Sequence, residues 1–363
     1  MHGRYWIKSQ AHHAHLRLPV AKVPAGSFFK MRKIKSQLLT AIIGLIIVIF
    51  LFWYIRVEEI LKAFSHFSLN NLIWFILVSI AIMVSLTLKW NIILKSQGYK
   101  IPFSKLFVYK LAGFGVSYVT PVAHMGGEPV RAYLLSHNHN IEFKKSLSSV
   151  VIDKSLDLSL DGFFACITII IILFNFTVSK RTAALMIFSF FAMMGAMYAF
   201  YHLTITERGF FTTCFRLLRL NKWKLTKKYE KEIKGMESHL IHFFKYNEKG
   251  FRNASLAFLL TWILMFFEYK LALLLLGYNA SFAAIFIVFS LVGLAYIIPV
   301  PAALGALEFG QSSASALLRV SSGIGLALSI VIRGRDMIWV FLGLSYLALH
   351  KIKFKNIKGN NNN

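Results

Sequence analysis

No charged side chain interrupts residues 271–307, which read LALLLLGYNASFAAIFIVFSLVGLAYIIPVPAALGAL over 37 positions. One helix needs about 20 mostly apolar residues to cross the ~30 Å hydrocarbon core of a bilayer, so this stretch is too long for a single ordinary span. Pro299 and Pro301 interrupt it near its end. Broken backbone at membrane depth is tolerated only where protein or a water-filled cavity surrounds it. The stretch therefore predicts a broken helical segment inside a membrane protein.

Shorter charge-free runs indicate that other parts of the chain also lie in a membrane. They cover residues 38–55, 72–88, 162–179 and 182–206. Hydrophobic residues make up 57% of the 363, only 15% are charged, and the mean hydropathy is +0.60. A soluble domain keeps roughly a quarter of its residues charged. We therefore expect an all-α polytopic membrane protein, located in the cell membrane.

The net charge of +26 raises the alternative of a nucleic-acid-binding protein, because basic patches are the usual footprint of that class. Lys and Arg instead gather in the tails and short connections, where they anchor to anionic lipid headgroups and fix orientation. We expect membrane lipids as partners, with anionic headgroups at the cytoplasmic face, and no nucleic acid. Cys166 and Cys214 form neither a disulfide framework nor a metal-binding spacing.

The two ends of the chain differ in composition from its middle. Residues 1–32 form a basic extension with four histidines and no acid. This composition favours a disordered extension over a histidine-rich metal site. Met31 opens the sequence MRKIK directly before the first apolar run, so a chain beginning there should insert and function like the full one. Residues 351–363 form a basic, asparagine-rich tail.

Landmarks recur along the chain at nearly one spacing, which indicates an internal repeat. The pattern Gly-x-x-Tyr-x-x-Pro occurs at 115–121 and again at 293–299, and each copy is followed by a glutamate. The sequence SVVID at 149–153 is echoed by SIVIR at 329–333. We define repeat one as residues 72–175 and repeat two as residues 252–349.

Each repeat divides into four helical pieces around a Pro/Gly elbow. The pieces are 72–94, 104–120, 128–137 and 147–175 in repeat one, and 252–275, 282–298, 308–318 and 322–349 in repeat two. The elbow residues are Pro121, Gly126, Gly127, Pro299, Pro301 and Gly305. Together with the flanking runs, the pieces define one integral membrane domain over residues 33–350.

Positive charge sets the orientation of the spans. Eight Lys or Arg precede the first apolar run and no acid occurs before Glu58, so the N-terminus is expected to be cytoplasmic. Residues 204–252 carry 12 Lys or Arg against five Glu, which predicts that the loop 204–251 is a cytoplasmic, amphipathic surface segment. The first long helix of repeat one runs inward to Lys89, Lys95, Lys100 and Lys105.

This orientation predicts six full spans, two re-entrant hairpins and a cytoplasmic C-terminus. The spans are 38–55, 72–94, 147–175, 182–203, 252–275 and 322–349. Pieces 104–120 and 128–137 would enter and leave from the cytoplasm, and pieces 282–298 and 308–318 from outside. The two repeats are therefore expected to be inverted. Only Lys180 and Arg181 lie on the unfavourable side.

Seven of the 15 acids lie within or at the edges of apolar segments: Glu128, Asp153, Asp157, Asp161, Glu268, Glu308 and Asp336. Ionisable groups in a membrane normally face a cavity or a partner, because burial in hydrocarbon is costly. Glu128 and Arg131 are three residues apart and able to pair on one helical face, and Arg333 is expected to approach Glu308. We predict a substrate pathway lined by Glu128, Arg131, Asp153, Asp157, Glu308, Arg333, Tyr118 and Tyr296.

Plainer interpretations compete with this pathway. Glu128 could be a helix-start carboxylate at the positive end of the helix dipole, and Tyr118 and Tyr296 could be packing aromatics. Asp161 could simply face water. Glu268 lies beside Lys270 near a span end and could snorkel to the interface, so it receives no role.

The chain contains no soluble catalytic motif. It has no Gly-rich phosphate loop, HExxH, nucleophile elbow or CxxC. We expect no catalytic residue, metal or cofactor.

Residues 121–131, PVAHMGGEPVR, and 148–157, SSVVIDKSLD, resemble the transmembrane region of the lysylphosphatidylglycerol synthases, also called the flippase-like domain family. Residues 298–308, IPVPAALGALE, followed by Arg333, resemble its second signature. The resemblance runs from about residue 33 to residue 350. It departs from the family at Asp153–Lys154, where Glu-Arg is usual, and at Ala302–Ala303, where Gly is common.

The resemblance implies a module that moves lipids or lipid-linked groups between leaflets, sometimes fused to a cytosolic aminoacyl transferase that this sequence does not contain. We expect a lipid translocase. The alternatives are a membrane-embedded lipid-modifying transferase of the phosphatidylglycerol lysyltransferase type, and a scaffold subunit for a separate transferase.

Overall fold

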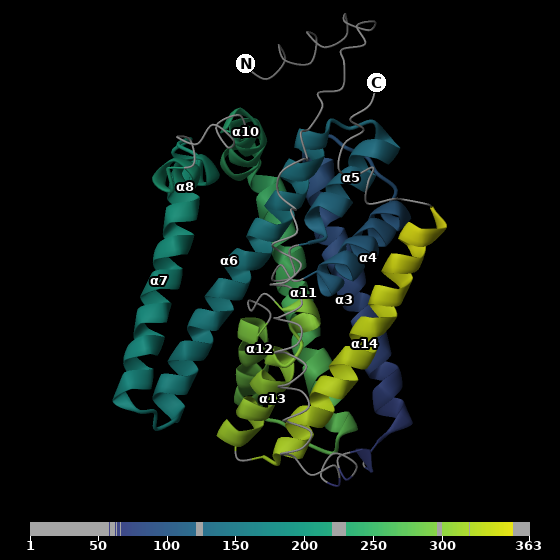
Figure 1. Ribbon diagram of the computed structural model, residues 1–363, viewed down its shortest axis with the longest axis vertical. Helices are drawn as coiled ribbons and strands as arrows, with labels where there is room; N and C mark the ends of the chain where they lie inside the picture. Colours follow the sequence, from purple (N-terminus) through teal and green to yellow (C-terminus); the bar gives the residue numbers. More distant parts are fainter. Residues whose placement is uncertain are drawn as a thin grey trace, which may run out of the picture.

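The computed structural model describes residues 67–120, 126–219, 230–295, 300–318 and 320–350, together with Glu58, Lys62, Phe64 and Ser65. Within these ranges every regular element is a helix (Figure 1). The expected extension 1–32, the first span 38–55 and the tail 351–363 lie outside the described residues, as do Pro121, Tyr296 and Pro299.

Five long helices form the frame of the molecule. Four of them have the length and composition to cross a membrane: α3 (Leu69–Ser96), α6 (Phe143–Asn175), α7 (Lys180–Ile205) and α11 (Glu248–Leu275). The fifth, α14 (Ser322–Leu349), has 28 residues but carries Arg333, Arg335 and Asp336 near its middle. These helices confirm a polytopic α-helical membrane protein, and their bounds fall within four residues of the predicted ones.

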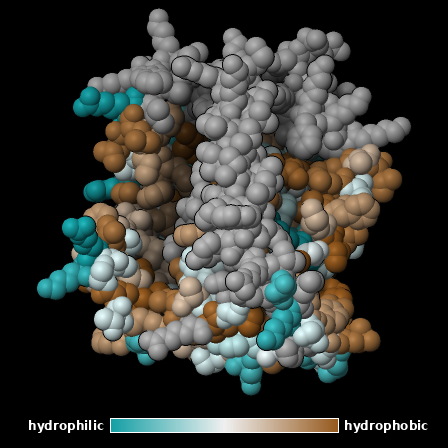
Figure 2. All heavy atoms as spheres, turned by 60° about the horizontal axis from the view of Figure 1, so that its bottom comes forward, coloured by the Kyte–Doolittle hydropathy of each residue, from teal (hydrophilic) through white to brown (hydrophobic). Residues whose placement is uncertain are grey.

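Apolar side chains cover much of the outside of this frame. On α7, Leu185, Phe188, Phe191 and Tyr198 are each at least two-thirds exposed. Figure 2 shows hydrophobic side chains on both flanks of the face in view. A monomer in water rarely exposes apolar surface on this scale, so the exterior suits contact with lipid.

Four shorter helices lie inside the frame in two pairs. The first pair is α4 (Phe103–Val119) with α5 (Glu128–His139), and the second is α12 (Phe282–Ala295) with α13 (Ala306–Leu317). Figure 1 shows α4 and α5 in the upper half of the molecule and α12 and α13 in the lower half. Each pair packs against a long helix of the other repeat, since α4 lies along α14 and α12 along α6.

The connection between α12 and α13 contains strained backbone. A short 3-10 helix spans Pro301–Ala303, and Ala302, Ala303 and Gly305 all have positive φ, at 55°, 47° and 78°. Residues with a Cβ rarely adopt this left-handed conformation, which costs of order 1–3 kcal/mol each. The two alanines therefore occupy positions whose backbone favours glycine, the residue common there in the resembling family.

Helices α3 and α11 pack against each other in antiparallel orientation. Both are 28 residues long. Asn247, which caps the start of α11, donates to the carbonyl of Ser96 at the end of α3 at 2.8 Å. Midway, the Thr261 hydroxyl donates to Ser85 Oγ at 2.8 Å. Small polar residues let helix backbones approach closely and add interhelical hydrogen bonds. These contacts hold α3 and α11 together along their length, and the pair forms the centre of the molecule.

The loop between the repeats folds into α8 (Phe210–Leu217) and α10 (Glu230–Tyr246), which lie together beyond the end of α7 (Figure 1). Glu237 of α10 is buried and accepts hydrogen bonds from the N–H groups of Phe211 and Thr212, at 2.6 and 3.0 Å. A carboxylate there satisfies the free N–H groups that begin a helix. Glu237 thus attaches α8 to α10.

Candidate functional site

Five charged side chains from four helices meet inside the upper half of the molecule. Two carboxylates, Asp153 and Asp157, lie one turn apart on α6. Three cations reach them: Lys89 of α3, Lys110 of α4 and Arg131 of α5. We call these five residues the α6 cluster.

Asp153 is the centre of the α6 cluster, and both it and Lys89 are fully buried. Its Oδ2 accepts hydrogen bonds from Lys110 Nζ and Arg131 Nη2, both at 2.7 Å. Its Oδ1 lies 3.0 Å from Lys89 Nζ. Lys89 also donates to Asp157 and, at 3.1 Å, to the backbone carbonyl of Asp153. One carboxylate thus serves three cations, and the cluster holds three positive charges against two negative ones.

Arg131 is held in place by its neighbours on α3 and α4. Its aliphatic stem crosses Gly113, where an added Cβ would lie 2.6 Å from Arg131 Cγ. Its guanidinium lies over the ring of Trp90, 4.2 Å from the centroid, which is a cation–π distance. A Cβ at Gly127 would overlap the backbone of Gly113. The Gly127 elbow therefore lets α5 approach α4 closely enough to bring Arg131 to Asp153.

A second group of buried charges lies on α14 and its neighbours. It comprises Glu268 of α11, Glu308 of α13, and Arg333, Arg335 and Asp336 of α14, and we call it the α14 cluster.

In the α14 cluster, Arg333 connects the two repeats. It donates to Glu308, to the carbonyl of Ala302 at 3.0 Å, and to the hydroxyl of Tyr118 on α4 at 3.2 Å. Glu308 also accepts from the N–H of Gly305 at 2.8 Å. The guanidinium thus joins the tip of the α12–α13 pair to the end of α4.

The other half of the α14 cluster is centred on Arg335. Its Nη1 donates to both carboxylate oxygens of Glu268, at 3.1 and 2.9 Å, and its Nε lies 3.1 Å from Asp336. Glu268 and Asp336 are both buried. Among the described residues the cluster holds three carboxylates and two guanidiniums, whereas the α6 cluster holds two carboxylates and three cations.

The two clusters carry opposite charges at corresponding positions of the repeats. Lys89 precedes the end of α3 at Ser96 by seven residues, and Glu268 precedes the end of α11 at Leu275 by seven. In the SVVID and SIVIR segments, Asp153 corresponds to Arg333. Because α3 and α11 are antiparallel, Lys89 and Glu268 lie toward opposite ends of the central pair.

The family model described as the lysylphosphatidylglycerol synthase TM region matches residues 39–343. The chain belongs to this family.

Relatives of this family member include archaeal proteins named UPF0104 membrane proteins. The one from Methanothermobacter thermautotrophicus is 26% identical over 266 residues, which cover 71% of this chain and 78% of the relative. The one from Methanocaldococcus jannaschii is 29% identical over 137 residues, 38% of this chain and 41% of the relative. The one from Pyrococcus horikoshii is 25% identical over 123 residues, 34% of this chain and 37% of the relative.

The structure tests the charge pairings predicted for this family member. The expected approach of Arg333 to Glu308 is confirmed. The pairing of Glu128 with Arg131 is wrong, because Arg131 turns toward Asp153. Glu128 begins α5, and its Oε2 is buried with no hydrogen-bond partner among the described residues.

The positions expected for Glu268 and Lys89, near the ends of their helices, also differ from the structure. Glu268 does not snorkel, since it is buried against Arg335. Lys89 was expected among the positive charges at the inward end of its helix, but it is fully buried against Asp153 and Asp157. Asp161 is exposed, which agrees with the interpretation that it faces water. Its Oδ1 accepts a hydrogen bond from Trp262 Nε1 at 3.0 Å.

The sequence interpretation missed Lys89, Lys110 and Arg335 as site residues. Lys110 offered a signal, because it is a lone cation in the middle of the apolar segment 106–119. Isolated intramembrane cations normally have a partner. Among the described residues, no three His, Cys, Asp or Glu side chains are placed to hold a metal ion.

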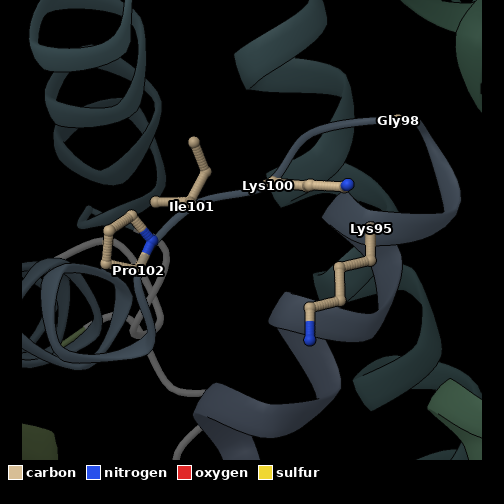
Figure 3. Close-up of a pocket in the computed structure, with 5 residues that line it drawn as sticks. All are labelled: Lys95, Gly98, Lys100, Ile101 and Pro102. Atoms are coloured by element: carbon tan, nitrogen blue, oxygen red, sulfur yellow. The ribbon is translucent and has the colours of Figure 1, made fainter.

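Two cavities in the described part of the chain are lined by residues of α3 or of the turn that follows it. One is an open depression of about 550 Å³ at the turn between α3 and α4, where Lys95 and Lys100 flank Gly98 (Figure 3). The other is an apolar groove of about 480 Å³ between α3 and α14, and Arg335 and Ser79 belong to its lining. The first presents positive charge at the surface, and the second joins an apolar surface to the α14 cluster.

Proposed function

We propose that this protein moves a lipid, or the headgroup of a lipid-linked molecule, from one leaflet of the cell membrane to the other. The observation that carries the proposal is the pair of buried charge clusters, each reached by a short helical hairpin from its own half of the molecule. Buried charges are costly and are retained where a polar substrate or ion passes. Membership of the family supports the same function.

The proposal includes an inverted repeat with two re-entrant hairpins and cytoplasmic termini. Helices α3 and α11 are equal in length and antiparallel, as inverted repeats require. The α4–α5 and α12–α13 pairs occupy opposite halves in Figure 1. The basic α8–α10 segment lies at the same end as α5, which favours a cytoplasmic position for that end.

The clusters suggest how a headgroup crosses. A charged headgroup can replace one member of an ion pair, so the site never leaves a buried charge uncompensated. The apolar groove between α3 and α14 gives an acyl chain a place beside the α14 cluster while the headgroup is inside. Arg333, which bonds Glu308 and Tyr118, lies between the two repeats and would change partners as the headgroup passes.

Cysteine labelling tests the proposed topology. Single cysteines at Asn279 and Val320 should react with an impermeant maleimide added outside intact cells, because both positions adjoin the α12–α13 hairpin. A cysteine at His137, in the last turn of α5, should react only after the cells are opened. External labelling of position 137 would contradict the re-entrant arrangement. Lys224, predicted to be cytoplasmic, lies outside the described residues.

Reconstitution tests the function itself. The purified full chain is placed in vesicles that contain a fluorescent phospholipid, and a membrane-impermeant reductant bleaches the outer leaflet. Protein-containing vesicles should lose the protected inner fluorescence, whereas protein-free vesicles should keep it. Retained protection in both would favour a scaffold for a separate transferase.

A further inference from the structure

The α6 cluster has one more cation than it can neutralise with its own carboxylates. Among the described residues, the ion pairs of Lys89, Lys110 and Arg131 are with Asp153 and Asp157, and all three cations are buried. A buried charge is stable only when it is paired and hydrogen-bonded. One further negative charge would therefore balance the cluster.

The hydrogen bonds show which cations would receive that charge. Lys89 is well supplied, because it donates to Asp157 and to the backbone carbonyl of Asp153 and lies 3.0 Å from Asp153 Oδ1. Lys110 and Arg131 share one acceptor atom, Asp153 Oδ2. An ammonium carries three N–H donors and a guanidinium five, so both have donors to spare.

Arg131 supplies a second, independent observation. Its side chain is more than nine-tenths buried, and its Nε has no hydrogen-bond partner among the described residues. Buried N–H groups of this kind are nearly always satisfied, so each exception calls for an explanation. A ligand oxygen beside Arg131 would satisfy it.

We infer that Lys110 and Arg131 form a binding site for one phosphodiester group, the linkage that carries the headgroup of a phospholipid. Its single negative charge would balance the three cations against Asp153 and Asp157. Its two free oxygens suit the fork of a guanidinium together with a nearby ammonium. The inference deepens the proposed function and rests on it for the route by which the lipid reaches the site.

The balance of three cations against two carboxylates also determines which phosphate groups the site would bind. A phosphomonoester carries about −1.5 to −2 at pH 7, and a diphosphate carries more, so either would leave the cluster with excess negative charge. Among the described residues the α14 cluster has three carboxylates and two guanidiniums, so it lacks this excess of cations and offers no second site of the same kind. The site therefore selects phosphodiesters, the linkage of phospholipids, over polyprenyl monophosphates and diphosphates.

Lys110→Met gives the sharpest test, because methionine is similar in length but uncharged. Without Lys110, the cluster is balanced: Lys89 and Arg131 against Asp153 and Asp157. We expect the thermal unfolding temperature of the purified full chain in detergent to stay the same or rise. Binding of a fluorescent short-chain phosphatidylglycerol should weaken at least ten-fold. A lysine with only a structural role would instead lower the unfolding temperature.

Two comparisons complete the experiment. Lys105→Met removes an exposed lysine from the same helix and should leave binding unchanged. Unlabelled dioctanoyl phosphatidylglycerol should displace the probe at lower concentration than farnesyl phosphate does. Wild-type binding by Lys110→Met, or stronger displacement by the monophosphate, would overturn the assignment.

The outcomes separate this site from the proposed translocation. If the wild-type chain binds the probe through Lys110 but does not move phospholipid in vesicles, the site stands and the translocase proposal fails. If wild-type and Lys110→Met proteins move phospholipid at equal rates, the translocase proposal stands and the site is wrong.

Discussion

Asp153→Asn is expected to destabilise the protein more than any other single change in the α6 cluster. The carboxylate lies between Lys89, Lys110 and Arg131, and none of its side-chain surface is exposed. Asparagine keeps the shape but removes the charge, which leaves three buried cations against Asp157 alone. Removing one partner of a buried ion pair typically costs ~3–5 kcal/mol. Thermal unfolding of the detergent-solubilised protein, followed by tryptophan fluorescence, would report the loss.

Two matched variants show whether the shared carboxylate is the cause. Asp157→Asn should cost much less, because Asp157 is partly exposed and contacts one cation. Adding Lys110→Met to Asp153→Asn should recover part of the lost stability, since one unbalanced cation is removed. If Asp153→Asn unfolded at the wild-type temperature, or if the added Lys110→Met gave no recovery, the charge account of the cluster would be wrong.

Arg333→Ala and Glu308→Gln are expected to stop lipid movement. Arg333→Ala leaves Glu308 buried without its cation and breaks the contact with Tyr118 across the repeats. Glu308→Gln keeps the shape and still accepts from the Gly305 N–H, so this variant should insert and fold. A loss of about 3 kcal/mol of transition-state stabilisation would slow translocation by roughly 100-fold. The bleaching assay in vesicles measures the rate.

Asp161→Asn is the control for these variants. Asp161 is also an acid on a long helix, but it is exposed and contacts Trp262 rather than a cation. The rate of Asp161→Asn should stay within about two-fold of the wild-type rate, because the asparagine Oδ1 can still accept from Trp262 and no buried cation loses its partner. If folded Glu308→Gln protein moved lipid as fast as Asp161→Asn protein, the proposed passage through the clusters would have to be abandoned.

The long helices and the Glu308–Arg333 contact could be predicted from sequence because both depend on regular patterns. Charge-free runs of about 20 residues have few alternatives to a membrane span. The repeat then aligned Arg333 with Asp153, and this placed it near the acid that follows the second elbow.

The partners of Arg131 and Lys89 could not be predicted, because they depend on packing between helices distant in sequence. A spacing of three residues makes Glu128 the obvious local partner of Arg131. The close approach at Gly113 and Gly127 instead directs Arg131 to Asp153 on another helix. Lys89 lies near the end of its helix and looks like a loop charge, but contact with α6 and α11 buries it.

In the proposed translocation, the membrane voltage would be a source of energy for any lipid that carries a net charge between the two clusters. In the proposed topology the cation-rich cluster faces the cytoplasm, so a monoanionic lipid that leaves it for the outer leaflet moves toward the positive side of an energised membrane. One elementary charge crossing 100 mV releases about 2.3 kcal/mol, which corresponds to a roughly 50-fold bias toward the outer leaflet. A zwitterionic lipid carries no net charge across and gains nothing from the voltage. Transport of an anionic phospholipid would thus be electrogenic and outward, with no coupled ion required.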